Sequence, residues 1–296
     1  MTLLALASPV PGAMGSWLDA RLASGFVFAL PLGLGGLFLL RFALLKRLGA
    51  GVSEPLEPAW RGAAAGLASL LALLAFTVVP PALLGAFRPG AAGYAPFAPA
   101  PGPPSPSSAP AAFGFFALQS LTEELLFRAF FLTLLAAAVL FLARLLFGPL
   151  AGADEPRRAA RRWLVCGLFA NAIQSLAFAS LHAINPNVTP LALLNIGLAG
   201  AVLGWLYWSE GGLLGCWTFH ALWNFSLAAL ALPVSGMTMG RPALATGIRG
   251  AGLPALSGGA FGPEGSVLST VTLGALLILL VRRSARKLPV AYPSSP

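Results

Sequence analysis

Charged residues are scarce in this chain: they make up only 9% of its 296 residues, while 57% of the residues are hydrophobic. A soluble globular domain carries about 25% charged residues, which keep its surface dispersed in water. The composition therefore excludes a soluble enzyme and a disordered tail. Cysteine is scarce too, since Cys166 and Cys216 are the only two and neither belongs to a C-x-x-C or Cys/His ligand cluster. This excludes a disulfide scaffold, and we expect both cysteines to be small core residues.

Long apolar runs are present instead, at the length of about 18 residues or more that crosses a bilayer. They predict an all-α, polytopic transmembrane helical bundle of about seven to eight spans. The seven predicted spans cover residues 25–45, 62–87, 112–147, 163–181, 189–208, 213–232 and 267–281. An eighth would come from splitting the third run or from inserting the N-terminus.

The predicted organisation has five parts. These are N-terminal membrane helices (1–88), a Pro/Ala/Gly-rich loop (89–111), a helical core (112–232), a Gly/Pro-rich loop (233–266), and a last membrane helix with a basic tail (267–296). Segments so rich in Pro and Gly bury little core, so both loops are expected to be extended or mobile. Pro9 and Pro11 break a short N-terminal apolar stretch that has no basic residues before it, so we expect no cleaved signal peptide.

The basic residues cluster at the ends of the apolar runs and give a formal net charge of +9. Membrane proteins keep such clusters on the cytoplasmic side. The pattern predicts a multi-pass protein of the cytoplasmic membrane, with the N-terminus outside and the C-terminus inside. Because the clusters form no basic stripe for phosphates, the expected partner is the lipid bilayer and not a nucleic acid.

Two adjacent acids, Glu123 and Glu124, lie inside the third apolar run, where an ionisable side chain costs about 2.5 to 3.5 kcal/mol and marks a candidate functional site. Glu124 and Arg128 are four residues apart, which places them on one helix face as an ion pair. Glu123 points elsewhere, and we expect no partner for it on its own helix. The alternative is that these residues only join helices by hydrogen bonds.

Both histidines of the chain lie in apolar helices. His182 follows Phe178, Ser175 and Asn171 at helical spacing, a stripe that indicates a cavity or groups that orient the site. His220 and Asn224 are one turn apart on another helix. A single membrane histidine usually only joins helices, but two with polar neighbours favour a site.

Glutamate, two imidazoles and a carboxamide form a set that can hydrolyse an amide. Glu123 with a histidine can act as general base on a water, and a histidine with an asparagine can donate to an oxyanion. The same Glu123, His182 and His220 can instead bind zinc, and the absence of an H-E-x-x-H motif leaves the two readings open.

Three motifs in order, E-E-x-x-x-R from Glu123 to Arg128, F-x-x-x-H from Phe178 to His182 and H-x-x-x-N from His220 to Asn224, resemble the CAAX-protease and bacteriocin-processing family (CPBP, or Abi). The resemblance covers 112–232 and is to type II CAAX prenyl endopeptidases. It implies an intramembrane endopeptidase with a catalytic cavity among its helices and a membrane-associated or C-terminal peptide as substrate. Glu123 and His182 would activate the water, and His220 and Asn224 would stabilise the oxyanion. Glu124, Arg128 and Phe178 would support the site, and zinc stays open.

Two other classes of protein remain as alternatives. Two histidines on separate membrane helices also suit a bis-His haem protein of electron transfer. A transporter or membrane scaffold could use the same polar residues to bind an ion or a peptide without cleaving it. The sequence names neither the substrate nor its prenylation.

Overall fold

The computed structural model describes residues 59–85, 87–90, 109–148, 155–210, 212–237, 247–250 and 253–291. The predicted span at 25–45, most of the predicted 1–88 unit and nearly all of the 89–111 loop lie outside these residues. The longer helices are α2 (Ala59–Thr77), α4 (Ala109–Glu124), α5 (Thr133–Phe147), α6 (Glu155–Leu181), α7 (Pro190–Ser209), α8 (Leu213–Ala229) and α10 (Val267–Ala291). The short elements are α3 (Val79–Leu83), η1 (Leu125–Leu132), η2 (His182–Ile184), α9 (Pro254–Ser257), η3 (Gly259–Phe261) and η4 (Pro263–Gly265).

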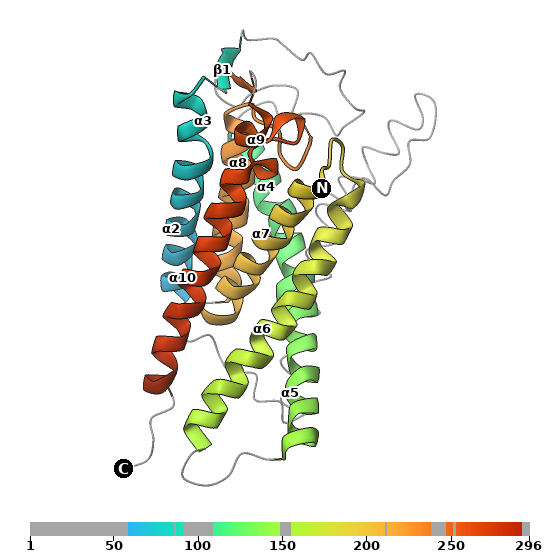
Figure 1. The fold of residues 1–296 in the computed structure, drawn as a ribbon, viewed down its shortest axis with the longest axis vertical. Coiled ribbons are helices and arrows are strands. Elements are labelled where there is room, and N and C mark those ends of the chain that lie inside the picture. The colour runs from blue at the N-terminus through green and yellow to red at the C-terminus, as the bar shows by residue number, and fades with distance from the viewer. Residues whose placement is uncertain are drawn as a thin grey trace.

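The helices form one bundle in which α8 and α7 are central. Helix α8 packs against α2, α4 and α7, and α7 also packs against α6 and α10 (Figure 1). Helix α5 runs beside α6 at one end of the bundle, and α9 lies at the other end. Two four-residue strands, β1 (Phe87–Gly90) and β2 (Gly247–Gly250), pair antiparallel beside α3, an addition to the all-α prediction.

Five helical segments of the described residues are long and apolar enough to cross a membrane. They are Trp60–Leu83, Ala109–Phe147, Arg158–Ile184, Pro190–Ser209 and Val267–Lys287. Each overlaps a predicted span, so apart from the short strand pair the described structure is that of a helical, multi-pass membrane protein. The predicted count of seven to eight is not confirmed. The run at 213–232 does form a helix, α8, but this helix ends at Ala229 and has 17 residues.

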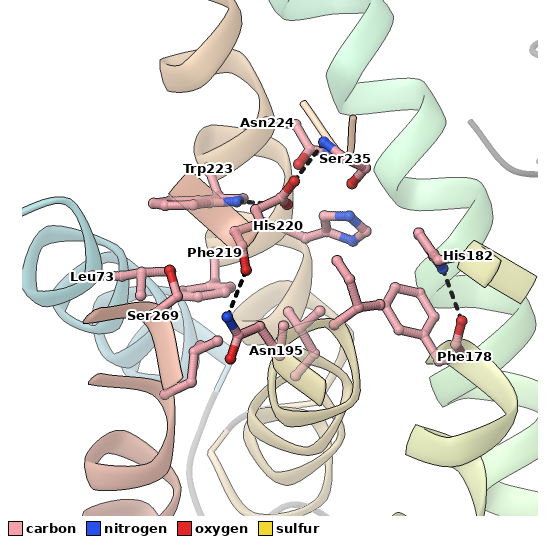
Figure 2. Close-up of a pocket in the computed structure, with 15 residues that line it drawn as sticks. Leu73, Phe178, His182, Asn195, Phe219, His220, Trp223, Asn224, Ser235 and Ser269 are labelled. Atoms are coloured by element: carbon pink, nitrogen blue, oxygen red, sulfur yellow. Dashed lines mark hydrogen bonds between the residues drawn. The ribbon is translucent and has the colours of Figure 1, made fainter. Parts of the chain in front are cut away.

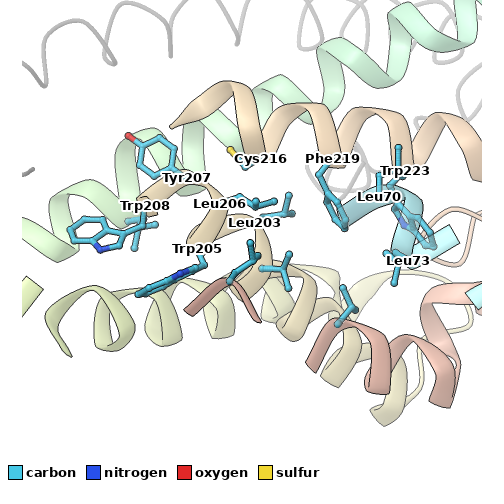
Figure 3. Close-up of a cluster of buried hydrophobic side chains, with 14 of the residues drawn as sticks. Leu70, Leu73, Leu203, Trp205, Leu206, Tyr207, Trp208, Cys216, Phe219 and Trp223 are labelled. Atoms are coloured by element: carbon cyan, nitrogen blue, oxygen red, sulfur yellow. The ribbon is translucent and has the colours of Figure 1, made fainter. Parts of the chain in front are cut away.

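Close contact between α2 and α8 is possible because glycines face each other at the crossing. A Cβ atom on Gly66 would collide with the backbone carbonyl oxygen of Gly215. Around this crossing the core is built from large aliphatic and aromatic side chains of α2, α7 and α8, including Leu70, Trp205 and Phe219 (Figure 3). The contact fixes the position of α8 along α2, and α8 is the helix that carries His220 and Asn224.

The third predicted span, 112–147, is one continuous helical run whose middle is a π-helix. Element η1 starts directly after Glu124 and ends at Leu132, between α4 and α5. The Thr133 hydroxyl donates to the Arg128 carbonyl, five residues earlier, at 3.2 Å. π-Helical turns inside α-helices are rare and often lie at functional sites.

Part of the predicted mobile loop at 233–266 is folded in the structure, while residues 238–246 and 251–252 lie outside the described residues. Its last part folds into α9, η3 and η4, and it buries Phe261 and Glu264 against the bundle. Four of its glycines, Gly258, Gly259, Gly262 and Gly236 before them, have φ between 60° and 95°. The glycines that predicted a loop are therefore the residues that allow this part of the chain to turn tightly.

Candidate active site

A cavity lies among α2, the end of α6, α7, α8, η4 and the start of α10 (Figure 2). Its empty volume is about 470 Å³, counting the space at its mouth. Apolar side chains line most of it. Four of the predicted site residues line it as well: Phe178, His182, His220 and Asn224. The sequence motifs of α6 and α8 therefore meet at one cavity.

Glu124 holds the centre of a buried polar chain beside this cavity. Arg128 Nη1 donates to Glu124 Oε1 at 2.8 Å, and His220 Nδ1 lies 2.7 Å from the same oxygen. Glu124 and Arg128 are both fully buried, and the Arg128 guanidinium also lies 4.4 Å from the centre of the Phe178 ring. The predicted Glu124–Arg128 pair is confirmed. Since a carboxylate accepts, it keeps a proton on Nδ1 of His220.

Glu123 lies on the other side of the same imidazole. Its Oε2 is 3.8 Å from His220 Nε2, and its Oε1 accepts a hydrogen bond of 2.5 Å from Gln119 Nε2. Gln119 Oε1 in turn accepts from Asn224 Nδ2 at 3.1 Å. The expectation that Glu123 has no partner on its own helix is therefore wrong. Gln119 is one turn earlier on α4, and this i, i+4 spacing was a signal that the sequence offered.

His182 begins η2, where α6 ends, and lines the cavity. Its Nδ1 lies 2.8 Å from the Phe178 carbonyl oxygen; because a carbonyl only accepts, Nδ1 carries the proton, and Nε2 is the acceptor of the neutral ring. The Phe178 ring packs against the His182 ring at 4.6 Å between centres. Glu123 and His182 are close enough to interact electrostatically.

The rest of the predicted polar stripe on α6 has a different role. Asn171 Nδ2 donates to the Ala201 carbonyl at 2.8 Å, and Ser175 Oγ donates to the Asn171 carbonyl at 2.6 Å. Neither side chain lines the cavity. The prediction that the stripe faces a cavity holds for Phe178 and His182 and is wrong for Asn171, which bonds α6 to α7, and for Ser175, which bonds within α6.

Zinc at Glu123, His182 and His220 remains a prediction. Within the part of the chain that the structure describes, no three His, Cys, Asp or Glu residues come together as a group that could hold a metal ion. Nδ1 of His220 is bonded to Glu124, and Nδ1 of His182 is bonded to a backbone carbonyl. Each ring therefore has Nε2 left to face the site, the nitrogen that would hold a water or a zinc ion.

A third carboxylate of the cavity, Glu264 of η4, was not predicted. Trp223 Nε1 of α8 donates to its Oε1 at 3.0 Å, and the Ser235 backbone N–H donates to its Oε2. Burial raises the pKa of this carboxyl group above its ordinary value. Glu264 belongs to a Gly/Pro-rich stretch that is typical of a loop, so no pattern in the sequence indicates its burial.

Residues 105–226 match the family model described as type II CAAX prenyl endopeptidase, Rce1-like. This segment is an Rce1-like domain. It contains all the predicted site residues from Glu123 to Asn224, and Gln119 with them, whereas Glu264 lies outside it. The resemblance read from the three motifs is thus confirmed for this segment. No curated protein and no solved structure matches the chain.

Proposed function

We propose that this chain is an intramembrane endopeptidase that hydrolyses a peptide bond of a membrane-associated substrate. The family match supports a CAAX-type protease. The observation that carries the mechanism is the arrangement around Glu123, whose two oxygens lie next to Gln119 and His220, and whose partner Gln119 binds Asn224. A general base is thereby placed beside two groups that can donate hydrogen bonds to an oxyanion.

In the proposed reaction, Glu123 and His182 share the proton of a water that attacks the scissile carbonyl carbon. Nε2 of His182 accepts, because Nδ1–H is bonded to the Phe178 carbonyl. The tetrahedral oxyanion accepts hydrogen bonds from Asn224 Nδ2 and from Nε2–H of His220. In this role His220 carries both ring protons, with Nδ1–H donating to Glu124. The proton taken from the water then passes to the leaving amine.

Glu124, Arg128 and Phe178 support these groups in the proposal. Glu124 fixes the orientation of His220, and Arg128 balances the Glu124 charge from 2.8 Å. An oriented imidazole loses less freedom when the reaction begins. Phe178 packs against His182 and lies 6.3 Å from His220 between ring centres, so it contacts both imidazoles.

No observation favours the two alternatives. In a bis-His haem protein a ring nitrogen of each histidine binds iron, but both ring nitrogens of His220 face glutamate oxygens, at 2.7 and 3.8 Å. A transporter or scaffold does not need an imidazole oriented as Glu124 orients His220. The proposal includes the predicted orientation, with the basic C-terminus in the cytoplasm.

Hydrolysis is tested on the purified full chain in detergent micelles or liposomes, with membrane-associated peptides that include a prenylated peptide ending in a CAAX sequence. In water enriched in oxygen-18, cleavage places one labelled oxygen in the new carboxyl group, and mass spectrometry detects it. Cleavage with this label supports a hydrolase. Peptides that bind without being cleaved after long incubation favour the scaffold or transporter reading.

A further inference from the structure

Glu264 of η4 links two parts of the chain by hydrogen bonds: Trp223 on helix α8, and Ser235 in the segment that follows α8. Both of its carboxylate oxygens accept a hydrogen bond: Oε1 from the indole of Trp223 at 3.0 Å, and Oε2 from the Ser235 backbone. Both donors are neutral N–H groups, so the carboxylate forms a two-point bridge. A bridge of this form needs two acceptor oxygens, which a carboxylate has and an amide lacks.

The backbone of Glu264 is fixed as well, from α7. Asn195 Nδ2 donates to the Glu264 carbonyl at 2.7 Å and to the Ser266 carbonyl at 2.8 Å. Asn195 Oδ1 accepts from the Thr270 hydroxyl of α10 at 2.7 Å. Because η4 is anchored on α7 and α10, the Glu264 carboxylate has a fixed position from which to hold Trp223.

Trp223 lies on α8 directly before Asn224 and three residues after His220, and its indole forms part of the cavity wall (Figure 2). A shift of the indole would displace the turn of α8 that carries both proposed oxyanion donors. Another polar group of this wall, Ser269 Oγ, donates to the Pro263 carbonyl at 2.6 Å and so also fixes η4. The polar atoms on this side of the cavity hold structure together and are not aimed at a ligand.

We propose that Glu264 is a positioning residue of the peptidase reaction, which acts through Trp223 on the placement of His220 and Asn224. The inference rests on the proposed function. It adds to the Rce1-like domain at 105–226 a requirement for a carboxylate that lies outside that segment. Small displacements of catalytic groups reduce the rate of the chemical step more than they reduce substrate binding.

Three variants of the full chain test this proposal: Glu264→Ala, Trp223→Phe and the double variant. Loss of the bridge should lower kcat by about 10-fold to 100-fold, the scale of a small misplacement, while KM stays near the wild-type value. Trp223→Phe removes the indole donor and keeps an aromatic ring, so it should lower kcat to a similar extent. If Glu264 acts through Trp223, the double variant should be no slower than the slower single variant.

Matched controls separate this effect from general damage. Trp205→Phe removes another buried indole bond, to Ser284 Oγ at 3.1 Å, and Glu210→Ala removes another buried carboxylate, which Lys287 binds at 3.0 Å. Neither residue lines the cavity, and both controls should keep the wild-type kcat. Glu264→Gln keeps one acceptor for Trp223 but loses the second point of the bridge, so it should recover only part of the rate lost in Glu264→Ala.

Rates are measured below the melting temperature of every variant. A kcat of Glu264→Ala equal to the wild-type value, or rate losses that multiply in the double variant, would overturn the positioning role while leaving the peptidase intact. A rise in KM alone would overturn it too, since it would make Glu264 a substrate-binding group. Absence of any cleavage by the wild-type protein would overturn the proposed function and this inference with it.

Discussion

At the residue scale, the buried charges of this protein all have specific partners among the described residues. Glu124 binds Arg128 and His220, Glu210 binds Lys287, and Glu264 accepts from two neutral donors. A buried charge that loses its partner costs far more than the pair contributes. A replacement that removes one member of a buried pair should therefore lower the free energy of unfolding more than a replacement that removes both members.

Arg128→Met should strongly destabilise the fold, because it leaves the Glu124 carboxylate buried without its guanidinium. Removing one partner of a buried pair costs about 3–5 kcal/mol. The double variant Glu124→Gln/Arg128→Met should recover most of this loss. Chemical denaturation of each variant in detergent measures its free energy of unfolding. An Arg128→Met variant as stable as the wild-type protein would show that the pair is not needed for folding.

Glu264 should make the stability of the protein depend on pH. Its pKa in the folded state is raised above the ordinary value of 4.5 by burial, so the folded state keeps its proton longer than the unfolded state does. Its contribution is fully present below the unfolded value and is lost as pH rises through the folded value. Melting temperatures of wild-type and Glu264→Gln protein, measured from pH 4 upward, should diverge in favour of the variant. Parallel curves would contradict the shift.

At the element scale, the sequence predicts what depends on local spacing. The Glu124–Arg128 pair follows from i, i+4 geometry, and the apolar runs locate the long helices. The π-helix η1 was not predictable, because its shifted backbone hydrogen bonds depend on packing against the neighbouring helices α6, α7 and α8. Burial of Glu264 was not predictable either, since its segment is rich in Gly and Pro and its partners, Trp223 and Asn195, lie far away in the sequence.

Gly66→Ala should force α2 and α8 apart, because the added Cβ would meet the Gly215 carbonyl oxygen. Overpacking of this kind costs about 1–3 kcal/mol. Gly274 of α10 is the matched control: among the described residues, nothing lies within 4 Å of the Cβ that an alanine would add there. Thermal unfolding in detergent should show a lower melting temperature for Gly66→Ala and little change for Gly274→Ala. Equal melting temperatures would mean that the crossing is looser than the structure shows.

At the scale of the whole molecule, the three motifs of separate helices predict which residues meet, and the structure brings Glu123, Glu124, His220 and Asn224 to one place through Gln119. The sequence leaves open how the helices that carry these motifs converge. The end of α6 at His182 and the folded segment at η4 answer this in part, because both lie at the cavity, which α8 lines with residues from its interior. These are tertiary features, set by packing between helices, and no local pattern encodes them.

The proposed peptidase should work without a bound metal. In the proposal its water is held and deprotonated by Glu123 and His182, and the described His and Glu residues form no group that could hold an ion. Incubation with EDTA or 1,10-phenanthroline, followed by removal of the chelator, should leave kcat/KM unchanged. The metal content of the active protein, measured by mass spectrometry, should stay well below one ion per chain. Activity that disappears with the chelator and returns with zinc would contradict a glutamate-based mechanism.

The most direct measurement is the rate of peptide cleavage by Glu123→Gln next to Glu210→Gln. Both replacements turn a buried carboxylate into an amide, but Glu210 pairs with Lys287 outside the cavity, whereas Glu123 lies 3.8 Å from His220. Loss of a general base typically costs about 10²- to 10⁴-fold in rate. We expect a loss of this size for Glu123→Gln, with near wild-type cleavage by Glu210→Gln. Undiminished cleavage by a folded Glu123→Gln protein would contradict the account.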